Sequence, residues 1–252
     1  VAVAGSADDA VTEALAEQGL EFGDLEPAEA AELLGRDERD DRRGRTGLHF
    51  RHPLIRSAVY HAAAPGRKRA AHRALAAVHG RRTGLGATER RAFHLAAATP
   101  GTDEDVAAQL TAAARSAAAR NNHVTALALL ERAAGLSPSG TARIRRLLEA
   151  ALTAQTAGNV AAATPLLDLA LVETDDPTLI TTACHLQCRV QMWSGQTIEA
   201  RDELLHLADR TRAADPPRSA AMRSQAALLS LTIGDQHLGR AAAAQAAADV
   251  RG

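Results

Sequence analysis

The segment GNVAAATPLLDLALVETDDP, from Gly158 to Pro177, decides the fold of this chain of 252 residues. Gly158 stands at its start, and a glycine can adopt the positive φ that a tight turn between helices requires. Five residues later comes Ala163, whose small side chain suits a point where one helix crosses another. The segment therefore predicts the second helix of a closely packed helix pair.

The same arrangement recurs along the second half of the chain. Candidate turn residues lie 37, 37 and 39 residues apart, at Asn121, Gly158, Gly195 and Gly234. Small residues follow five positions after each, at Ala126, Ala163, Ala200 and Gly239, and precede each by seven, at Ala114, Ala151, Cys188 and Ala227. This combination is typical of tetratricopeptide repeats, although the period is slightly long and the usual aromatic residues are missing. The spacing predicts about four helix pairs in residues 103–252, which would form a curved stack with a concave binding surface.

The composition supports a mainly α-helical chain. Alanine, the strongest helix former, makes up about a quarter of the residues, whereas aromatic residues make up 2%. No catalytic constellation is recognisable, so an enzyme is the least favoured class. The two cysteines share one helical pattern, and no apolar run approaches a membrane span; we therefore expect a reduced, cytoplasmic protein without a membrane contact.

A second informative stretch is FRHPLIRSAVY, from Phe50 to Tyr60. Pro53 favours an extended residue before it and fits the first turn of a helix, so a short strand is expected to enter a helix here. Apolar residues then recur at helical spacing and predict a face that packs in the core: Leu54, Ile55, Ala58, Val59 and Ala62.

The residues around this stretch complete a small mixed module. Pro65 opens a second helix with Leu75 and Val78 inward and four basic residues outward: Arg67, Lys68, Arg69 and Arg73. Upstream, one helix is expected to end at Gly19 and another to run from Pro27 through Leu33 and Leu34 to Gly35. With a polar loop over 36–47, these elements predict a partial winged-helix-like module over 1–82.

Together with the basic helix PGRKRAAHRALAAV and the later FHLAAA at 93–98, FRHPLIRSAVY resembles the end of the ATPase region in large ATP-binding regulators of the LuxR family. These regulators are signal-transduction ATPases with numerous domains. In that family a P-loop ATPase ends in a winged-helix-like subdomain, a tetratricopeptide-like array follows, and a C-terminal helix-turn-helix binds DNA. The chain lacks the GxxxxGK[ST] motif and a following helix-turn-helix, so it resembles an internal piece.

The resemblance implies three segments: a winged-helix-like module over 1–82, a linker helix over 83–102 and the helical array over 103–252. It implies no cofactor in this chain, with ATP and Mg²⁺ bound by the flanking ATPase of the parent protein and DNA contacted only through the parent's helix-turn-helix domain. His52, Pro53 and Arg56 are the candidate contacts with the nucleotide-binding module. The effector, a peptide, protein or small molecule, is not identified.

The net charge of −1 conceals a strong asymmetry. Residues 1–40 carry twelve acidic and two basic residues, whereas residues 41–95 carry thirteen basic and two acidic ones. A patch centred on Arg67, Lys68, Arg69 and Arg73 is compatible with DNA binding. The alternative that we favour is that the acidic and basic parts face each other or a neighbouring domain.

Other combinations of polar residues are more simply explained by structure. Cys184, His185 and Cys188 have metal-ligand spacing, but Cys188 holds a helix-crossing position; His49, His52 and His61 lack a carboxylate partner. Asp202, Glu203 and His206 resemble an exposed charged face, so no catalytic or metal site is assigned.

Trp193, the only tryptophan, is a candidate lining residue of the repeat surface together with Arg189, or else a residue that fills the alanine-rich core. The favoured function is the regulatory middle section of an ATP-dependent LuxR-type activator. A stand-alone repeat scaffold that binds proteins, or direct DNA binding by the basic patch, are the alternatives.

Overall fold

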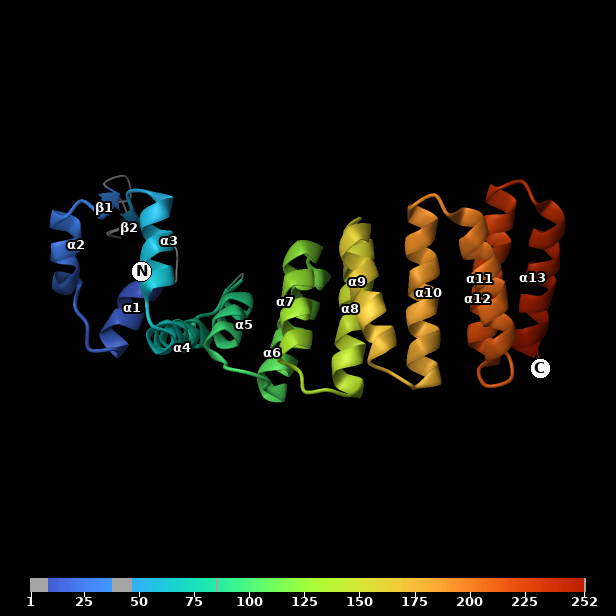
Figure 1. Ribbon diagram of the computed structural model, residues 1–252, viewed down its shortest axis with the longest axis horizontal. Coiled ribbons are helices and arrows are strands. Elements are labelled where there is room, and N and C mark those ends of the chain that lie inside the picture. Colours follow the sequence, from blue (N-terminus) through green and yellow to red (C-terminus); the bar gives the residue numbers. More distant parts are fainter. Residues whose placement is uncertain (1–8, 38–46, 85, 252) are drawn as a thin grey trace. The chain divides into compact units, whose positions relative to one another are not determined.

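The computed structural model describes residues 9–37, 47–84 and 86–251 and divides the chain into two compact units. Unit 1 ends at Ala114 and unit 2 begins at Arg115, within helix α6. In unit 2, helices α7 to α13 lie side by side in chain order (Figure 1). The bounds of the helices after residue 100 are α6 Glu104–Ala119, α7 His123–Leu136, α8 Thr141–Thr156, α9 Val160–Val172, α10 Pro177–Trp193, α11 Thr197–Thr211, α12 Pro216–Thr232 and α13 Gln236–Arg251.

Four turns of one design join the two helices of each pair. The four predicted turn residues all have positive φ: Asn121 (59°), Gly158 (73°), Gly195 (84°) and Gly234 (86°). The residue after each donates its backbone N–H to the carbonyl five residues earlier, at 2.8 to 3.0 Å: Asn122 to Ala117, Asn159 to Ala154, Gln196 to Gln191 and Asp235 to Ser230. This left-handed cap satisfies carbonyls that the ending helix leaves without partners. The sequence prediction of the turns is therefore confirmed.

The same residues that follow three of these turns also begin the next helix. Asn122, Asn159 and Asp235 each accept, through a side-chain oxygen, the N–H three residues on, at 3.3, 3.2 and 3.1 Å. A short polar side chain at this position satisfies one of the free N–H groups of a helix start. Two adjacent residues thus end one helix and start its partner.

The helix-crossing positions are buried as predicted. Ala126, Ala163 and Ala200 are fully buried, and Ala151 and Cys188 are 1% exposed. The last pair crosses closely, because a Cβ atom placed on Gly239 would lie 3.2 Å from the carbonyl oxygen of Ala227. Small side chains at these points let the helix axes approach, and larger apolar residues such as Leu167, Leu204 and Met222 fill the space between the crossings.

Unit 1 is built around helix α4, Pro65–Arg81. The remaining elements are α1 Asp9–Glu17, the 3-10 helix η1 Phe22–Leu25, α2 Glu26–Ala30, β1 Leu34–Asp37, β2 Gly47–Phe50, α3 Pro53–Ala62 and α5 Ala87–Ala98. One side of α4 packs on α1, where Val11, Leu75 and Val78 form the core with Leu34, and another side packs on α5. The inward positions predicted for α4 are confirmed at Leu75 and Val78.

The acidic and basic segments of unit 1 meet where the end of α4 lies beside α1. Arg81 contacts Glu17 at 2.5 Å and Arg82 contacts Glu13 at 2.8 Å, joining the ends of α4 and α1. Because these side chains are partly exposed, each pair contributes at most about 1 kcal/mol, and their main effect is to fix how α1 lies on α4.

Two expectations for unit 1 are wrong. Leu33 and Leu34 do not continue the second helix: Glu32 takes a positive φ of 56°, the helix ends at Ala30, and Leu34 pairs with Phe50 in a two-stranded antiparallel sheet. The predicted polar loop over 36–47 lies mostly outside the described residues.

The second wrong expectation is the core face of α3. No residue of α3 is buried; Leu54 is 71% and Val59 44% exposed. The apolar spacing is present, but α3 contacts the end of β2 and, through Tyr60 and the carbonyl of His61, Lys68 of α4, and these contacts leave Leu54 and Val59 exposed among the described residues.

We expect Ala163→Leu to destabilise unit 2 by about 1–3 kcal/mol, because the larger side chain must enter a crossing with no free volume. The matched control is Ala161→Leu, which makes the same change on an exposed position of α9 and should stay within about 0.5 kcal/mol of the native chain. Urea unfolding followed by circular dichroism measures both. Equal stabilities for the two variants would contradict the role given to the crossing positions.

Candidate functional site

The first helices of successive pairs, α8, α10 and α12, form one layer of unit 2. Helix α8 packs on α10 as well as on its own partner. Between α10 and α12, His185 Nε2 lies 2.6 Å from Gln225 Oε1, and Arg218 donates to the hydroxyl of Thr182. Because the helices on the inside of a curved stack lie closest to one another, these contacts identify the layer as the inner one.

The His185 contact also fixes the charge state of this residue. Burial lowers the pKa of His185, as do the positive charges of Arg189 and Arg218, whereas its hydrogen bond to Gln225 acts in the opposite direction. His185 is therefore neutral near pH 7, and its Nε2–H donates to the amide oxygen of Gln225. The inner layer is held together by an uncharged hydrogen bond.

A set of side chains projects from the inner layer without being covered. We call Arg145, Leu152, Arg189, Trp193 and Leu228 the inner face. Leu152, Arg189 and Leu228 occupy the same repeat position, six residues before the turn glycines of their helices. Trp193 lies one helical turn beyond Arg189 on the same side of α10. Equivalent positions on three neighbouring helices thus present leucine, arginine and leucine in a row.

The exposure of these residues differs from that of ordinary core residues. Leu152 is 39%, Leu228 64% and Trp193 71% exposed, whereas the neighbouring crossing residues are buried. Among the described residues, Arg189 has no carboxylate partner. Ile198, 53% exposed, follows the same turn as Trp193 and adds to its apolar edge. A row of uncovered apolar groups around a cation is the composition of a protein-binding surface.

One of the two sequence expectations for Trp193 is wrong. Trp193 is not a core residue that fills space between alanines, because it is 71% exposed at the end of α10. Its role as a lining residue of the repeat surface with Arg189 stays a prediction. Leu152 and Leu228 were not identified from the sequence. Each lies six residues before a turn glycine, and this shared spacing could have identified them.

Other arginines near the array have structural roles. Arg143 pairs with Glu173 at 2.7 Å, Arg146 is buried against the hydroxyl of Ser137, and Arg201 contacts Asp202 and Asp235. These side chains join helices or helix ends within unit 2, whereas on the inner layer Arg145 is exposed and Arg189 is half-buried, and neither has a carboxylate partner among the described residues.

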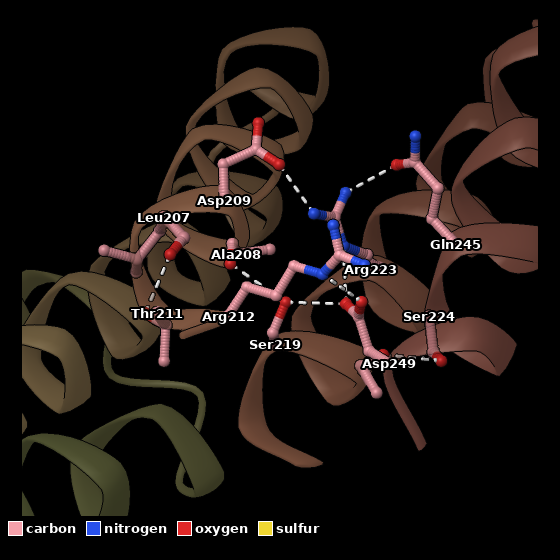
Figure 2. Close-up of polar contacts among 11 residues, drawn as sticks. Leu207, Ala208, Asp209, Thr211, Arg212, Ser219, Arg223, Ser224, Gln245 and Asp249 are labelled. Atoms are coloured by element: carbon pink, nitrogen blue, oxygen red, sulfur yellow. Dashed lines mark hydrogen bonds and ion pairs between the residues drawn. The ribbon is translucent and has the colours of Figure 1, made fainter. Parts of the chain in front are cut away.

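Figure 2 shows a buried charge cluster between α11, α12 and α13. Arg223 donates to Asp249 at 2.9 Å, to Gln245 at 2.6 Å and to Asp209 at 2.6 Å. The hydroxyl of Ser219 donates to the same Asp249 oxygen at 2.8 Å. Burial alone would raise the pKa of Asp249, but the hydrogen bonds from Ser219 and Arg223 and the charges of Arg223 and Arg212 outweigh it and lower the pKa.

This cluster is structural rather than chemical. The carboxylate of Asp249 already accepts bonds on both oxygens, because Arg212 holds the other one at 2.8 Å. The partners come from three successive helices, so the cluster fixes how the last pair docks on α11. A buried charge without these partners would be strongly destabilising.

The other residues that the sequence analysis considered for a catalytic or metal site do not form one in the described part of the chain. Cys188 is buried in the core between α10, α11 and α12, and burial raises its pKa to about 12. Asp202, Glu203 and His206 are exposed side chains of α11. Among the described residues, no group of three or more His, Cys, Asp or Glu could hold a metal ion, and no helix is long and apolar enough to cross a membrane.

In unit 1, His52 caps α3, and its Nδ1 accepts the N–H of Leu54 at 3.1 Å. Pro53 follows at the first helical position and Arg56 lies on the exposed side of the same helix. The four basic residues predicted as a patch begin α4; Arg67 and Arg73 are exposed, and Lys68 lies 4.9 Å above the ring centre of Tyr60.

A histidine cluster between α4 and α5 was not predicted. The Nδ1 atoms of His72 and His94 lie 2.9 Å apart, and the rings of His79 and His94 stack with centres 5.5 Å apart. All three residues are buried. Burial, followed by the charges of His72, His79 and Arg90, lowers the pKa of His94 to about 4. The sequence signal is the single seven-residue step from His72 to His79, which places both on one side of α4, followed by His94 on α5.

Comparison with known proteins finds similarity only at the level of structure. No family model matches the chain, and no curated protein matches it. A signal-transduction ATPase with numerous domains and a tetratricopeptide repeat sensor, from Pyrococcus horikoshii, superimposes with a TM-score of 0.50 at 12% identity. The match covers 98% of this chain and 42% of that protein, so this chain spans less than half of the length of the Pyrococcus protein.

A second solved structure is a putative kinesin light chain from Podospora anserina with nearly identical tetratricopeptide-like repeats. It matches with a TM-score of 0.53 at 18% identity, over 74% of this chain and 96% of that one. At these identities the likeness shows the fold. With the helix pairs described above, it establishes an all-α, tetratricopeptide-like repeat architecture.

We expect unit 1 to lose stability as the pH falls from 6.5 toward 4. The unfolded chain protonates His94 near its ordinary pKa of 6.5, whereas the folded chain resists protonation until about pH 4, so protons favour unfolding in this window. The loss contributed by His94 should reach about 3 kcal/mol at the lower end.

Urea unfolding followed through Tyr60, the only tyrosine, reports on unit 1 separately from Trp193 in unit 2. His94→Leu should remove most of this pH dependence, and His206→Leu on the exposed side of α11 should leave it unchanged. A native-like pH dependence in His94→Leu would show that the histidine cluster is not its source.

Proposed function

We propose that this chain is the regulatory middle section of an ATP-dependent transcriptional regulator of the LuxR type, in which the helical array binds a protein or peptide partner on its inner face. The observation that carries the proposal is the row of Leu152, Arg189 and Leu228 at equivalent positions on three neighbouring helices, in which both leucines are exposed and the arginine between them is half-buried. A tetratricopeptide-like array of this kind is a protein-interaction scaffold.

The inner face indicates the chemistry of the partner. Leu152 and Leu228 offer apolar contact on either side of the cation Arg189, and Trp193 extends the apolar surface by one helical turn. The complementary segment carries an acidic residue flanked by apolar ones. Tryptophan and arginine are the residue types that most often dominate the binding energy of protein interfaces.

Two observations support a place within a larger regulator. The stretch FRHPLIRSAVY resembles the end of the ATPase region in such proteins, and the structural likeness to the Pyrococcus ATPase with a repeat sensor extends over both units. In this proposal unit 1 is the winged-helix-like module, and the uncovered face of α3, with His52, Pro53 and Arg56 at its start, contacts the flanking ATPase. ATP, Mg²⁺ and DNA are then bound by flanking domains of a cytoplasmic protein.

The partner site is tested by selecting peptides from a random library on the whole chain. Selected peptides should contain an acidic residue among apolar ones. Leu228→Glu and Arg189→Glu should each weaken the best peptide by about tenfold or more, since each removes a central contact and opposes the peptide's charge.

The matched control is Val172→Glu, which introduces the same charge at a side chain that is 85% exposed on α9, in the outer layer. This variant should bind within about twofold of the native chain. Peptides that are insensitive to Leu228→Glu and Arg189→Glu, or sensitive to Val172→Glu, would place the partner site elsewhere.

The assignment of nucleotide binding to another domain gives a separate prediction. Adding ATP and Mg²⁺ to this chain should leave its melting temperature unchanged, because only a ligand that binds the folded state raises stability, and the increase grows with the logarithm of ligand concentration above Kd. Differential scanning calorimetry, with a nucleotide-free buffer as control, makes the measurement. A rise that grows with the logarithm of ATP concentration would mean that unit 1 itself belongs to the nucleotide site.

A further inference from the structure

A cavity of about 530 Å³ lies within unit 1, beside its core. It is bounded by α1, α2, the two strands, the end of α3 and the start of α4, whose positions can be followed in Figure 1. Its walls are almost entirely aliphatic or aromatic, with Val11, Leu15, Leu25, Phe50 and Leu75 contributed by four different elements. The volume is within the range of sites that bind small organic molecules.

Within residues 9–37 and 47–84, the apolar walls are not closed. Leu20 is 43%, Leu33 39% and Val59 44% exposed, although all three side chains line the cavity. Protein interiors are normally packed with few voids larger than a water molecule. An apolar space of this size in a small unit is therefore one that an apolar group from outside can fill favourably.

Both cations of the lining are consecutive residues. Arg67 and Lys68 lie in the first turn of α4, and Lys68 Nζ is held 3.4 Å from the carbonyl oxygen of His61 and 4.9 Å from the ring centre of Tyr60. No acidic residue is among the described residues that line the cavity, and Arg67 has no carboxylate partner among them. Positive charge therefore collects where α3 meets α4, and no acidic side chain of the described lining neutralises it.

We propose that this cavity binds an amphiphile with one anionic head and an unbranched aliphatic tail, such as a medium-chain carboxylate. Arg67 and Lys68 bind the head, and the tail lies along Val11, Leu15 and Phe50. Guanidinium groups bind carboxylates through paired hydrogen bonds, and the aliphatic walls offer no partner for a polar tail. The inference concerns unit 1 alone and does not depend on the partner site of the array.

The contribution of the tail to binding is tested by isothermal titration calorimetry of the whole chain. The ligands are octanoate, decanoate, dodecanoate and tetradecanoate, each below its critical micelle concentration. Affinity should rise by about three- to fourfold for each added methylene and then stop rising once the tail fills the cavity. A chain length beyond which affinity no longer rises distinguishes a site of finite length from loose association with the surface. Absence of saturable binding, or a rise that continues through the whole series, overturns the proposal.

Charge-removing variants test the head. The double variant Arg67→Gln and Lys68→Gln should bind dodecanoate about tenfold or more weakly. Arg73→Gln removes a charge from the same helix outside this cavity and should bind within about twofold of the native chain. Because Arg67 is exposed and Lys68 half-buried, the double variant is expected to fold.

Two further binding measurements complete the test, one with an uncharged ligand and one with a variant that fills the cavity. Decanol, which has the same tail length as decanoate and no charge, should bind the native chain no more tightly than decanoate binds the double variant. Ala71→Phe places a ring in the cavity and should abolish binding while the chain still unfolds cooperatively. Native affinity for dodecanoate in the double variant, or equal affinity for decanol and decanoate, contradicts the assignment of the head group.

Discussion

Close approach of helices at small residues is the constraint on which the array depends. With few large side chains available, the helices can bury enough apolar surface only if their axes come close, and that requires Ala, Cys or Gly at every crossing. The turn residues with positive φ also keep the helix axes close. Each allows the chain to reverse its direction within two residues, so that the second helix of a pair packs on the first. A larger residue at a crossing separates a pair, and the neighbouring pairs lose their contacts in turn.

This constraint also explains where function can reside. Residues at the crossings and along the pair interfaces must be small or apolar because they pack in the core. The side chains whose type packing does not determine are those that the stack leaves uncovered. Leu152, Arg189 and Leu228 share one such position, and the stack brings them into a row although they are far apart in sequence. Unit 1 follows a different plan, in which a few helices around α4 leave an apolar cavity and the face of α3 uncovered.

The array was predictable from the sequence because its geometry repeats. Spacing located the turns and crossings without any knowledge of tertiary contacts, and the structure confirms Asn121, Gly158, Gly195 and Gly234. Unit 1 was less predictable because nothing in it repeats. A positive φ at Glu32 turned an expected helix into a strand, and helical periodicity in α3 showed an apolar face without showing whether anything covers it.

The candidate site was predicted only in part, for a similar reason. Trp193 and Arg189 stood out by residue type, whereas Leu152 and Leu228 are ordinary leucines whose exposure depends on the layer to which their helices belong. The clusters around Arg223 and His94 combine residues from different helices. No local sequence pattern predicts which side chains from different helices come into contact.

The central claim is that the inner face of the array is its binding surface. Hydrogen exchange of the whole chain, with and without its tightest selected peptide, tests this most directly. The account predicts slower exchange in α10 and α12, with the outer helices α9 and α11 unchanged. Slower exchange confined to α9 and α11, or none in unit 2, would contradict it.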